Sequence, residues 1–166
     1  MALIRRSGWA LAMAAIAGLA LPWPAAAAEP SWGEAEVSTT FGSAIEFIQP
    51  VTLETAPVRV ELLVGTPGAL GPEVVEVPAP AGGGRVVLEY SYGIGGAALP
   101  PNTVIEARWR VTDRVGRTYL GPLATVRYSD DRFRWRTVSG SLVNVHWYEG
   151  DTAFGRRALA IGEDAV

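Results

Sequence analysis

Apolar and polar side chains alternate with a period of two through most of residues 36–128, and turn-forming residues interrupt the alternation about every ten positions. The cleanest stretch is 104–112, in which every second side chain is apolar: Ile105, Ala107, Trp109 and Val111. Successive side chains of a strand point to opposite faces, so this strand has one apolar and one polar face. The pattern predicts a mainly β protein whose core includes Trp109.

Turn and breaker residues divide this region into about seven strands. Gly116 ends a turn at 113–116 and suits a positive φ, which predicts a hairpin between 104–112 and 117–128. Proline removes a backbone donor, so we expect 73–77, between Pro72 and Pro78, to be an edge strand. We expect Pro50 to kink the run that starts at Ile45. The number of strands fits an immunoglobulin-like β-sandwich over residues 29–128.

A shorter β-type pattern follows in residues 129–148. Phe133 and Trp135 alternate with arginines, as on a half-buried strand. A second strand is predicted at 143–148, with Val145 and Trp147 on its apolar face and His146 on its polar face. These segments predict a short hairpin after the sandwich.

A helix is predicted to begin after Asp151, which is a good N-cap. Its larger apolar residues form one stripe with a neighbour beside it: Phe154, Ala158, Ile161 and Leu159. Gly155 and Gly162 weaken the helix, and an isolated helix of this length is marginal in water. We therefore expect the strand and helix of residues 129–166 to need a packing partner from another polypeptide segment.

The N-terminal residues have the order of an export signal. Arg5 and Arg6 precede the uncharged run 8–21, and small residues end at Ala28, after which we expect cleavage. The alternative is an uncleaved anchor, because 7–28 lacks charge and approaches the roughly 20 residues of a membrane span. Pro22 and Pro24 favour cleavage, so we expect a secreted or extracytoplasmic protein without a stable membrane span.

Composition narrows the classes of partner and chemistry. The chain has 14 basic residues, all arginine, and 17 acidic residues, and its formal net charge is −3. Nucleic-acid binding requires a basic surface, so we expect no nucleic-acid partner. The chain contains no cysteine, which excludes disulfides and thiolate chemistry.

Few residues are candidates for catalysis. His146 is the single histidine, whereas a serine or cysteine nucleophile needs a base with an orienting acid and catalytic zinc needs three ligands. Asp130 and Asp131 are adjacent, so on a strand they face opposite ways and cannot act as an acid–base pair. We expect no catalytic, cofactor-binding or metal-binding residue in this chain.

The run 99–105, Leu-Pro-Pro-Asn-Thr-Val-Ile, lies directly before the Trp109 strand. It is similar to the L-x-P-x-T-x-Y run that opens the late hairpin of fibronectin type III domains. Leu99, Pro101 and Thr103 match, and Ile105 stands where that family has tyrosine. The resemblance implies a fibronectin III-like sandwich that lacks the family's tyrosine-corner hydrogen bond.

A longer resemblance covers residues 131–159, DRFRWRTVSGSLVNVHWYEGDTAFGRRAL. This stretch looks like the opening of the catalytic domain in exported bacterial proteins of the peptidase MA-like, or gluzincin, zinc metallopeptidase group. In that group a signal peptide and a β-sandwich precede a strand ending in H-W-Y-x-G and a first helix. The matching residues are Arg132, Phe133, Trp135, Val143, Val145, His146, Trp147, Tyr148, Gly150, Phe154, Ala158 and Leu159. The resemblance implies that 129–166 is the opening segment of a truncated peptidase-like domain.

The zinc motif H-E-x-x-H of that group needs two histidines and is absent. The resemblance therefore carries no zinc ligand to this chain and implies zinc only in the full-length family. Our first hypothesis is a non-catalytic N-terminal accessory region whose partner is the missing catalytic domain or another protein. The alternative is a free-standing extracytoplasmic Ig-like binding module. The candidate interface residues are Trp147, Phe154, Leu159 and Ile161.

Overall fold

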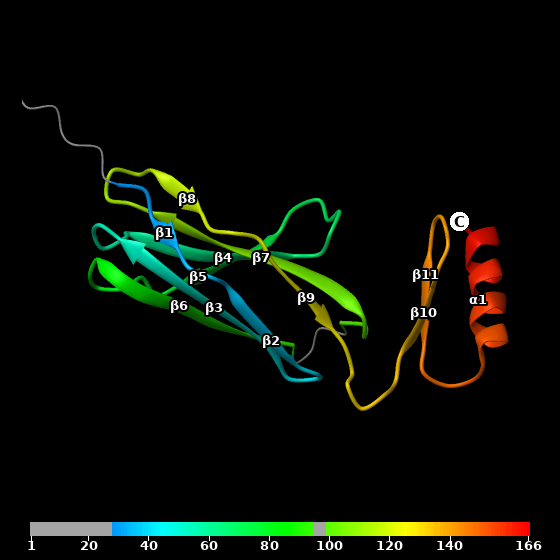
Figure 1. Cartoon of the computed structure of the whole chain (residues 1–166). Coiled ribbons are helices and arrows are strands. Elements are labelled where there is room, and N and C mark those ends of the chain that lie inside the picture. The colour runs from blue at the N-terminus through cyan, green and yellow to red at the C-terminus, as the bar shows by residue number, and fades with distance from the viewer. Residues whose placement is uncertain (1–27, 95–98) are drawn as a thin grey trace, which may run out of the picture.

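The computed structural model describes residues 28–94 and 99–166, so all but the last residue of the predicted export signal lies outside it. The described chain is mainly β, with one helix near its C-terminus (Figure 1). Within these ranges, no helix has the length and apolar character needed to cross a bilayer. In chain order the elements are β1 (Ser31–Trp32), β2 (Glu36–Thr40), β3 (Ala44–Leu53), β4 (Arg59–Gly65), β5 (Glu73–Val77), β6 (Gly84–Gly93), β7 (Thr103–Thr112), β8 (Thr118–Leu120), β9 (Ala124–Tyr128), β10 (Arg136–Ser139), β11 (Asn144–Trp147) and α1 (Thr152–Asp164).

The strands β1 to β9 form two antiparallel sheets, each built around one ten-residue strand. In the first sheet, β1 and β2 pair with one side of β3 and β6 pairs with the other. In the second, β4 and then β5 lie on one side of β7, and β8 and β9 lie on the other. The chain crosses between the sheets after β3, β5 and β6. The prediction that 73–77 is an edge strand is confirmed by the position of β5.

The two sheets pack face to face and bury one common apolar core. Every second residue of β7 is buried, and Trp109 is 3% exposed, which confirms its predicted core position. The opposite residues of β7 are partly exposed and include the charged side chains Glu106, Arg108 and Arg110. The first sheet contributes its own alternating set, which includes Ile45, Phe47, Val51 and Leu53 of β3.

The expected kink at Pro50 is wrong, because β3 continues through this residue without interruption. The carbonyl oxygen of Pro50 accepts a hydrogen bond from the Gly33 backbone N–H at 2.8 Å, in the gap between β1 and β2. The missing proline N–H therefore points to a place where the ladder is already broken. Gln49, which is fully buried, donates from Nε2 to the Gly33 and Pro50 carbonyls at 2.8 and 3.0 Å.

The hairpin after β7 is confirmed, and Gly116 has the expected positive φ of 82°. Its returning half is two strands rather than one, because Gly121, Pro122 and Leu123 interrupt the strand between β8 and β9. The Gly121 N–H still donates to the Trp109 carbonyl at 2.8 Å. A Cβ at Gly121 would lie 3.1 Å from the Trp32 ring, so glycine allows β1 to pack against this break.

Tyr128, the last residue of β9, joins several segments at one end of the sandwich through hydrogen bonds and ring stacking. It is 1% exposed, its hydroxyl accepts a hydrogen bond from the Gly42 N–H at 2.7 Å, and its ring stacks on Phe41 with centroids 5.0 Å apart. Its carbonyl accepts from the Asn102 N–H at 2.6 Å. Tyr128 thus links the β2–β3 turn to the segment that enters β7, although Ile105 replaces the tyrosine expected at that end.

We predict that Tyr128→Phe lowers the free energy of unfolding by about 1 kcal/mol, because it removes one net hydrogen bond and preserves the ring. Urea denaturation of the purified protein measures this change. Tyr90→Phe is the matched control, since the described residues give the Tyr90 hydroxyl no hydrogen-bond partner, and we expect its effect to stay within about 0.5 kcal/mol. Equal losses in the two variants would contradict the role of the Tyr128 hydroxyl.

Candidate protein-interaction surfaces

Strands β10 and β11 and helix α1 form a unit that we call the hairpin–helix unit. Arg136 to Ser139 pair with Asn144 to Trp147 in an antiparallel hairpin, and α1 covers the side of it that faces away from the sandwich (Figure 1). The strand expected around Phe133 and Trp135 is wrong, because β10 starts only at Arg136. Residues 131–133 form a turn instead, and residues 134–135 belong to no strand.

The helix begins as predicted. Asp151 adopts an extended backbone conformation, and its Oδ1 accepts a hydrogen bond from the Phe154 N–H at 2.8 Å. Gly150 has a φ of 97°, a conformation that glycine adopts without strain, and it turns the chain from β11 into the helix. The chemistry of this local turn places the helix back over the hairpin that precedes it.

Glycines make the contact between the helix and the hairpin. Gly155 is the one buried residue of α1, and a Cβ there would lie 2.5 Å from the nearest ring carbon of Trp147. About two helical turns later, a Cβ at Gly162 would lie 3.0 Å from Cγ2 of Val143. Leu159 lies between them in the helix and is half-buried. These glycines have low helix propensity, and their lack of a side chain lets the helix approach a partner within its own chain.

Glu163, near the C-terminal end of α1, forms hydrogen bonds with the turn between β10 and β11. Its Oε1 accepts hydrogen bonds from the backbone N–H groups of Leu142 and Val143 at 2.9 and 3.0 Å, and its Oε2 accepts from the Ser141 hydroxyl at 2.5 Å. The Ser141 hydrogen bond is the largest of the effects that hold the pKa of Glu163 below its ordinary value, followed by the two backbone N–H groups. The charged Glu163 carboxylate thus accepts the hydrogen bonds of turn N–H groups in place of backbone carbonyl groups of the hairpin.

The four predicted interface residues divide into two pairs. Trp147 is 7% exposed and Leu159 is half-buried, since both pack inside the hairpin–helix unit. Phe154 and Ile161 are 46% and 70% exposed and lie seven positions apart, on a second stripe of α1. We call Phe154 and Ile161 the outer stripe. It is the part of the predicted interface that a partner can reach.

An aromatic cluster lies where the unit joins the sandwich. Phe133 packs on Tyr148 with ring centroids 4.3 Å apart, and Trp135 meets both rings edge-on. The Arg132 guanidinium lies over the Phe133 ring and, 5.6 Å from its centroid, over Phe41 of the sandwich. Asp130 holds this arginine at 2.6 Å, and the hydrogen bond keeps the pKa of Asp130 below its ordinary value. These contacts connect the hairpin–helix unit to the end of the sandwich at which Tyr128 and Phe41 stack.

His146 lies on the hairpin face opposite α1. Its Nδ1 is 2.9 Å from the Thr137 hydroxyl, and burial, together with the charge of Arg127, lowers the pKa of the imidazole. The described residues place no carboxylate in hydrogen bond with this ring, so the hydroxyl–imidazole pair lacks the orienting acid of a nucleophilic site. The same part of the chain holds no group of three or more His, Asp or Glu residues suited to a metal ion.

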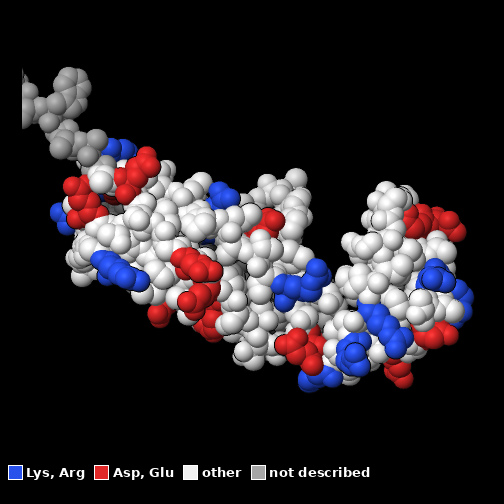
Figure 2. All heavy atoms as spheres, in the orientation of Figure 1, with Lys and Arg blue, Asp and Glu red and all other residues white. Residues whose placement is uncertain are grey.

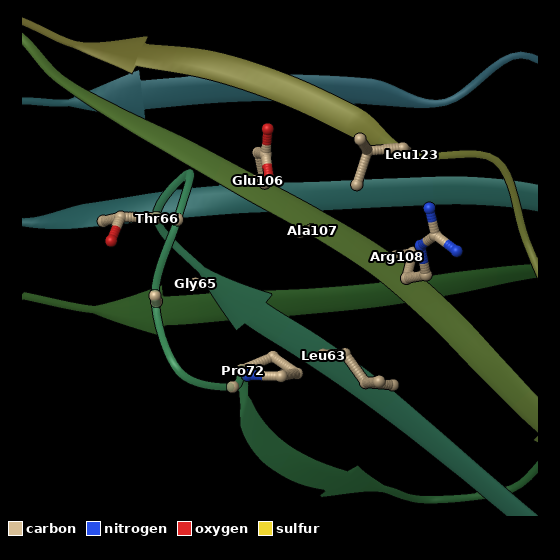
Figure 3. A pocket seen from close by; sticks show the side chains of 11 residues that line it. Leu63, Gly65, Thr66, Pro72, Glu106, Ala107, Arg108 and Leu123 are labelled. Carbon is tan, nitrogen blue, oxygen red and sulfur yellow. The ribbon is translucent and has the colours of Figure 1, made fainter.

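A groove of about 270 Å³ lies on the outer face of the second sheet. The loop between β4 and β5 overhangs it, and Leu63, Pro72 and Leu123 supply apolar walls (Figure 3). Glu106 and Arg108 project from the same face of β7 beside the groove. Neither makes a salt bridge within the described residues. The groove can therefore offer one carboxylate and one guanidinium to a ligand with an apolar part.

Arginine and acidic side chains are interspersed over the visible face of the sandwich, and a gap separates the upper part of the hairpin–helix unit from the sandwich, which the unit joins below (Figure 2). Comparison of the chain with protein-family models, with curated proteins and with solved structures finds no match. The assignment of residues 129–166 to a truncated peptidase-like domain stays a prediction, as does the assignment of the sandwich to the fibronectin type III family.

Sequence reasoning missed Tyr128, Glu163 and the packing role of Gly155. The spacing of Gly155, Leu159 and Gly162 carried a usable signal, since small and apolar residues at i, i+4 and i+7 mark one helix face. Glu163 carried none, because its partners are two backbone N–H groups and the Ser141 hydroxyl, 20 to 22 residues away.

We predict that Gly155→Ala destabilises the hairpin–helix unit. Alanine gains up to about 1 kcal/mol of helix propensity, but overpacking against the Trp147 ring costs about 1–3 kcal/mol, so the clash outweighs the gain. Amide hydrogen exchange of α1 measures the change. Gly162→Ala is the comparison, because its added methyl meets only one methyl group of Val143, and we expect a smaller effect. Slower exchange in Gly155→Ala than in the unchanged protein would contradict the close contact.

We predict that Glu163 makes the unit sensitive to acid. The folded-state pKa is lower than the ordinary 4.5, so the carboxylate stabilises the unit above about pH 4.5, and this stabilisation is lost as the pH falls through the folded pKa. Thermal unfolding followed by the circular dichroism of the helix should show this loss. Glu163→Gln should be less stable at neutral pH and should lack that pH dependence, and an identical profile in both proteins would exclude the carboxylate as its source.

Proposed function

We propose that the chain is a non-catalytic, protein-binding accessory region of an exported zinc metallopeptidase-like protein. In this proposal residues 29–128 are an immunoglobulin-like sandwich of the fibronectin III type. The support is its two facing antiparallel sheets, with connections that cross between the sheets after β3, β5 and β6. The similarity of Leu99, Pro101 and Thr103 to the fibronectin motif supports the same assignment.

The outer stripe is the observation that carries the functional proposal. One face of α1 already packs against the hairpin through Gly155 and Gly162, yet Phe154 and Ile161 remain exposed on a second face. Exposed apolar groups that lie together on an ordered element are typical of protein-binding surfaces. The resemblance of residues 131–159 to the opening of a gluzincin domain supports a zinc peptidase catalytic domain as the proposed partner. The zinc and the catalytic groups then belong to that partner, and this chain is not itself an enzyme.

Export of the protein is part of the proposal. The charged start, uncharged run and small-residue ending of residues 1–28 support a cleaved signal, and the absence of cysteine means that export requires no disulfide. The mature chain is then secreted or extracytoplasmic.

Genomic DNA provides the first test. We expect the sequence after the codon for Val166, in any of the three frames, to encode an H-E-x-x-H domain. That domain should bind this protein, and the double variant Phe154→Ser/Ile161→Ser should weaken binding at least about tenfold in calorimetry, as loss of interface hot spots does. Val115→Ser is the matched control, since Val115 is also exposed but lies in the β7–β8 turn. Unchanged binding by the double variant would contradict the outer stripe as the interface.

The purified protein alone should not cleave casein, and proteolysis abolished by a chelator would overturn its non-catalytic assignment.

A second candidate function, a free-standing extracytoplasmic binding module, is favoured by the groove under the β4–β5 loop. Its apolar walls and its pair of charged groups fit a small amphiphilic ligand. The lack of any encoded H-E-x-x-H domain would favour this second function.

A further inference from the structure

Strand β6 forms an edge of the first sheet. It pairs with β3 along ten consecutive residues without a bulge, and within the described residues no strand pairs with its other side. A free edge exposes backbone donors and acceptors, and most proteins protect such edges with prolines, bulges or short strands. The opposite sheet follows this rule, because Pro72 and Pro78 flank its edge strand β5. Strand β6 contains no proline and is twice as long as β5.

The outward face of β6 carries a symmetric arrangement of side chains. Arg85, Val87 and Glu89 all point away from the core and are exposed, and Val87 is 51% exposed. The alternate residues face the core, and Leu88 is buried among them. Arg85 and Glu89 thus carry opposite charges and lie at equal distances along the strand on either side of Val87.

We propose that two copies of this protein associate through their β6 edges into a continuous antiparallel sheet, with a two-fold axis at Val87. In this register Val87 lies opposite Val87 of the second copy, Arg85 lies opposite Glu89, and Glu89 lies opposite Arg85. The interface is isologous, so each contact occurs twice. This inference goes beyond the proposed function and does not depend on it.

Physical constraints select this register over its neighbours. A two-fold axis perpendicular to the sheet keeps both outer faces on the same side, so outward residues must oppose outward residues. An axis at Arg85 or Glu89 would place like charges opposite each other, which is unfavourable. An axis at Leu88 would pair Glu89 with Val87 and leave both charges without a partner. The axis at Val87 alone gives two opposite-charge pairs around an apolar pair.

The overlap in this register runs from Gly84 to Tyr90 in each copy, which makes a small interface without a second layer. An interface of this size is typical of weak, reversible complexes. Its two exposed charge pairs should make the association sensitive to salt. We therefore expect a dimer that forms at high protein concentration and dissociates on dilution.

Charge reversal at the edge tests the proposal. Sedimentation velocity of the purified full chain, over a concentration series up to about 1 mM, should detect the dimer. Arg85→Glu makes both edge charges negative and Glu89→Arg makes both positive, so each variant alone should self-associate at least about tenfold more weakly. An equimolar mixture of the two variants should restore a heterodimer, because each pair is again of opposite sign. High salt should weaken the dimer of the unchanged protein and this heterodimer alike.

The controls separate the edge from net charge. Arg114→Glu and Glu34→Arg make the same charge changes at exposed sites outside β6, and these variants should dimerise as the unchanged protein does. Recovery of association in the mixture also demonstrates that both edge variants are folded. A protein that stays monomeric over the whole series, edge variants that dimerise normally, or a mixture that stays monomeric would each overturn the proposal.

Discussion

The contact between the inner faces of β3 and β7 is the constraint on which the rest of the fold depends. Each is the central strand of its sheet, and each places alternate side chains in the shared core, among them Phe47 and Trp109. A shift of one residue in either strand would turn that apolar set to solvent, so burial sets the register of both sheets. Features that look like defects in the sequence are tolerated where this contact persists. Pro50 stays in β3 because its missing donor faces a gap between β1 and β2.

The hairpin–helix unit solves a different packing problem. Two strands alone are marginally stable in water, and so is one helix of this length. Close approach at Gly155 brings the helix backbone against the Trp147 ring, and the Glu163 carboxylate joins the far end of the helix to the hairpin turn. The unit therefore covers its own apolar strand face. What remains exposed is the outer stripe, and this division between internal and external apolar groups gives the proposed interface its physical basis.

The two proposed association surfaces differ in the interaction that drives them. The outer stripe offers apolar side chains from a helix, so its affinity depends on the area buried by a complementary partner. The β6 edge offers unpaired backbone groups with a symmetric charge pattern, so its specificity depends on register and on salt. A single β-sandwich can use both at once, because edges and attached elements are separate parts of the surface.

Local patterns in the sequence determined the mainly β character, the core position of Trp109, the turn at Gly116 and the N-cap at Asp151, because each depends on residues close in the chain. The tertiary structure alone decided the rest. Whether Pro50 breaks a strand depends on what lies beside it, and whether Gly155 weakens or seats a helix depends on the ring it meets. The exposure of Phe154 and Ile161 was decided in the same way, since an apolar residue faces solvent or core according to partners that the local sequence does not specify.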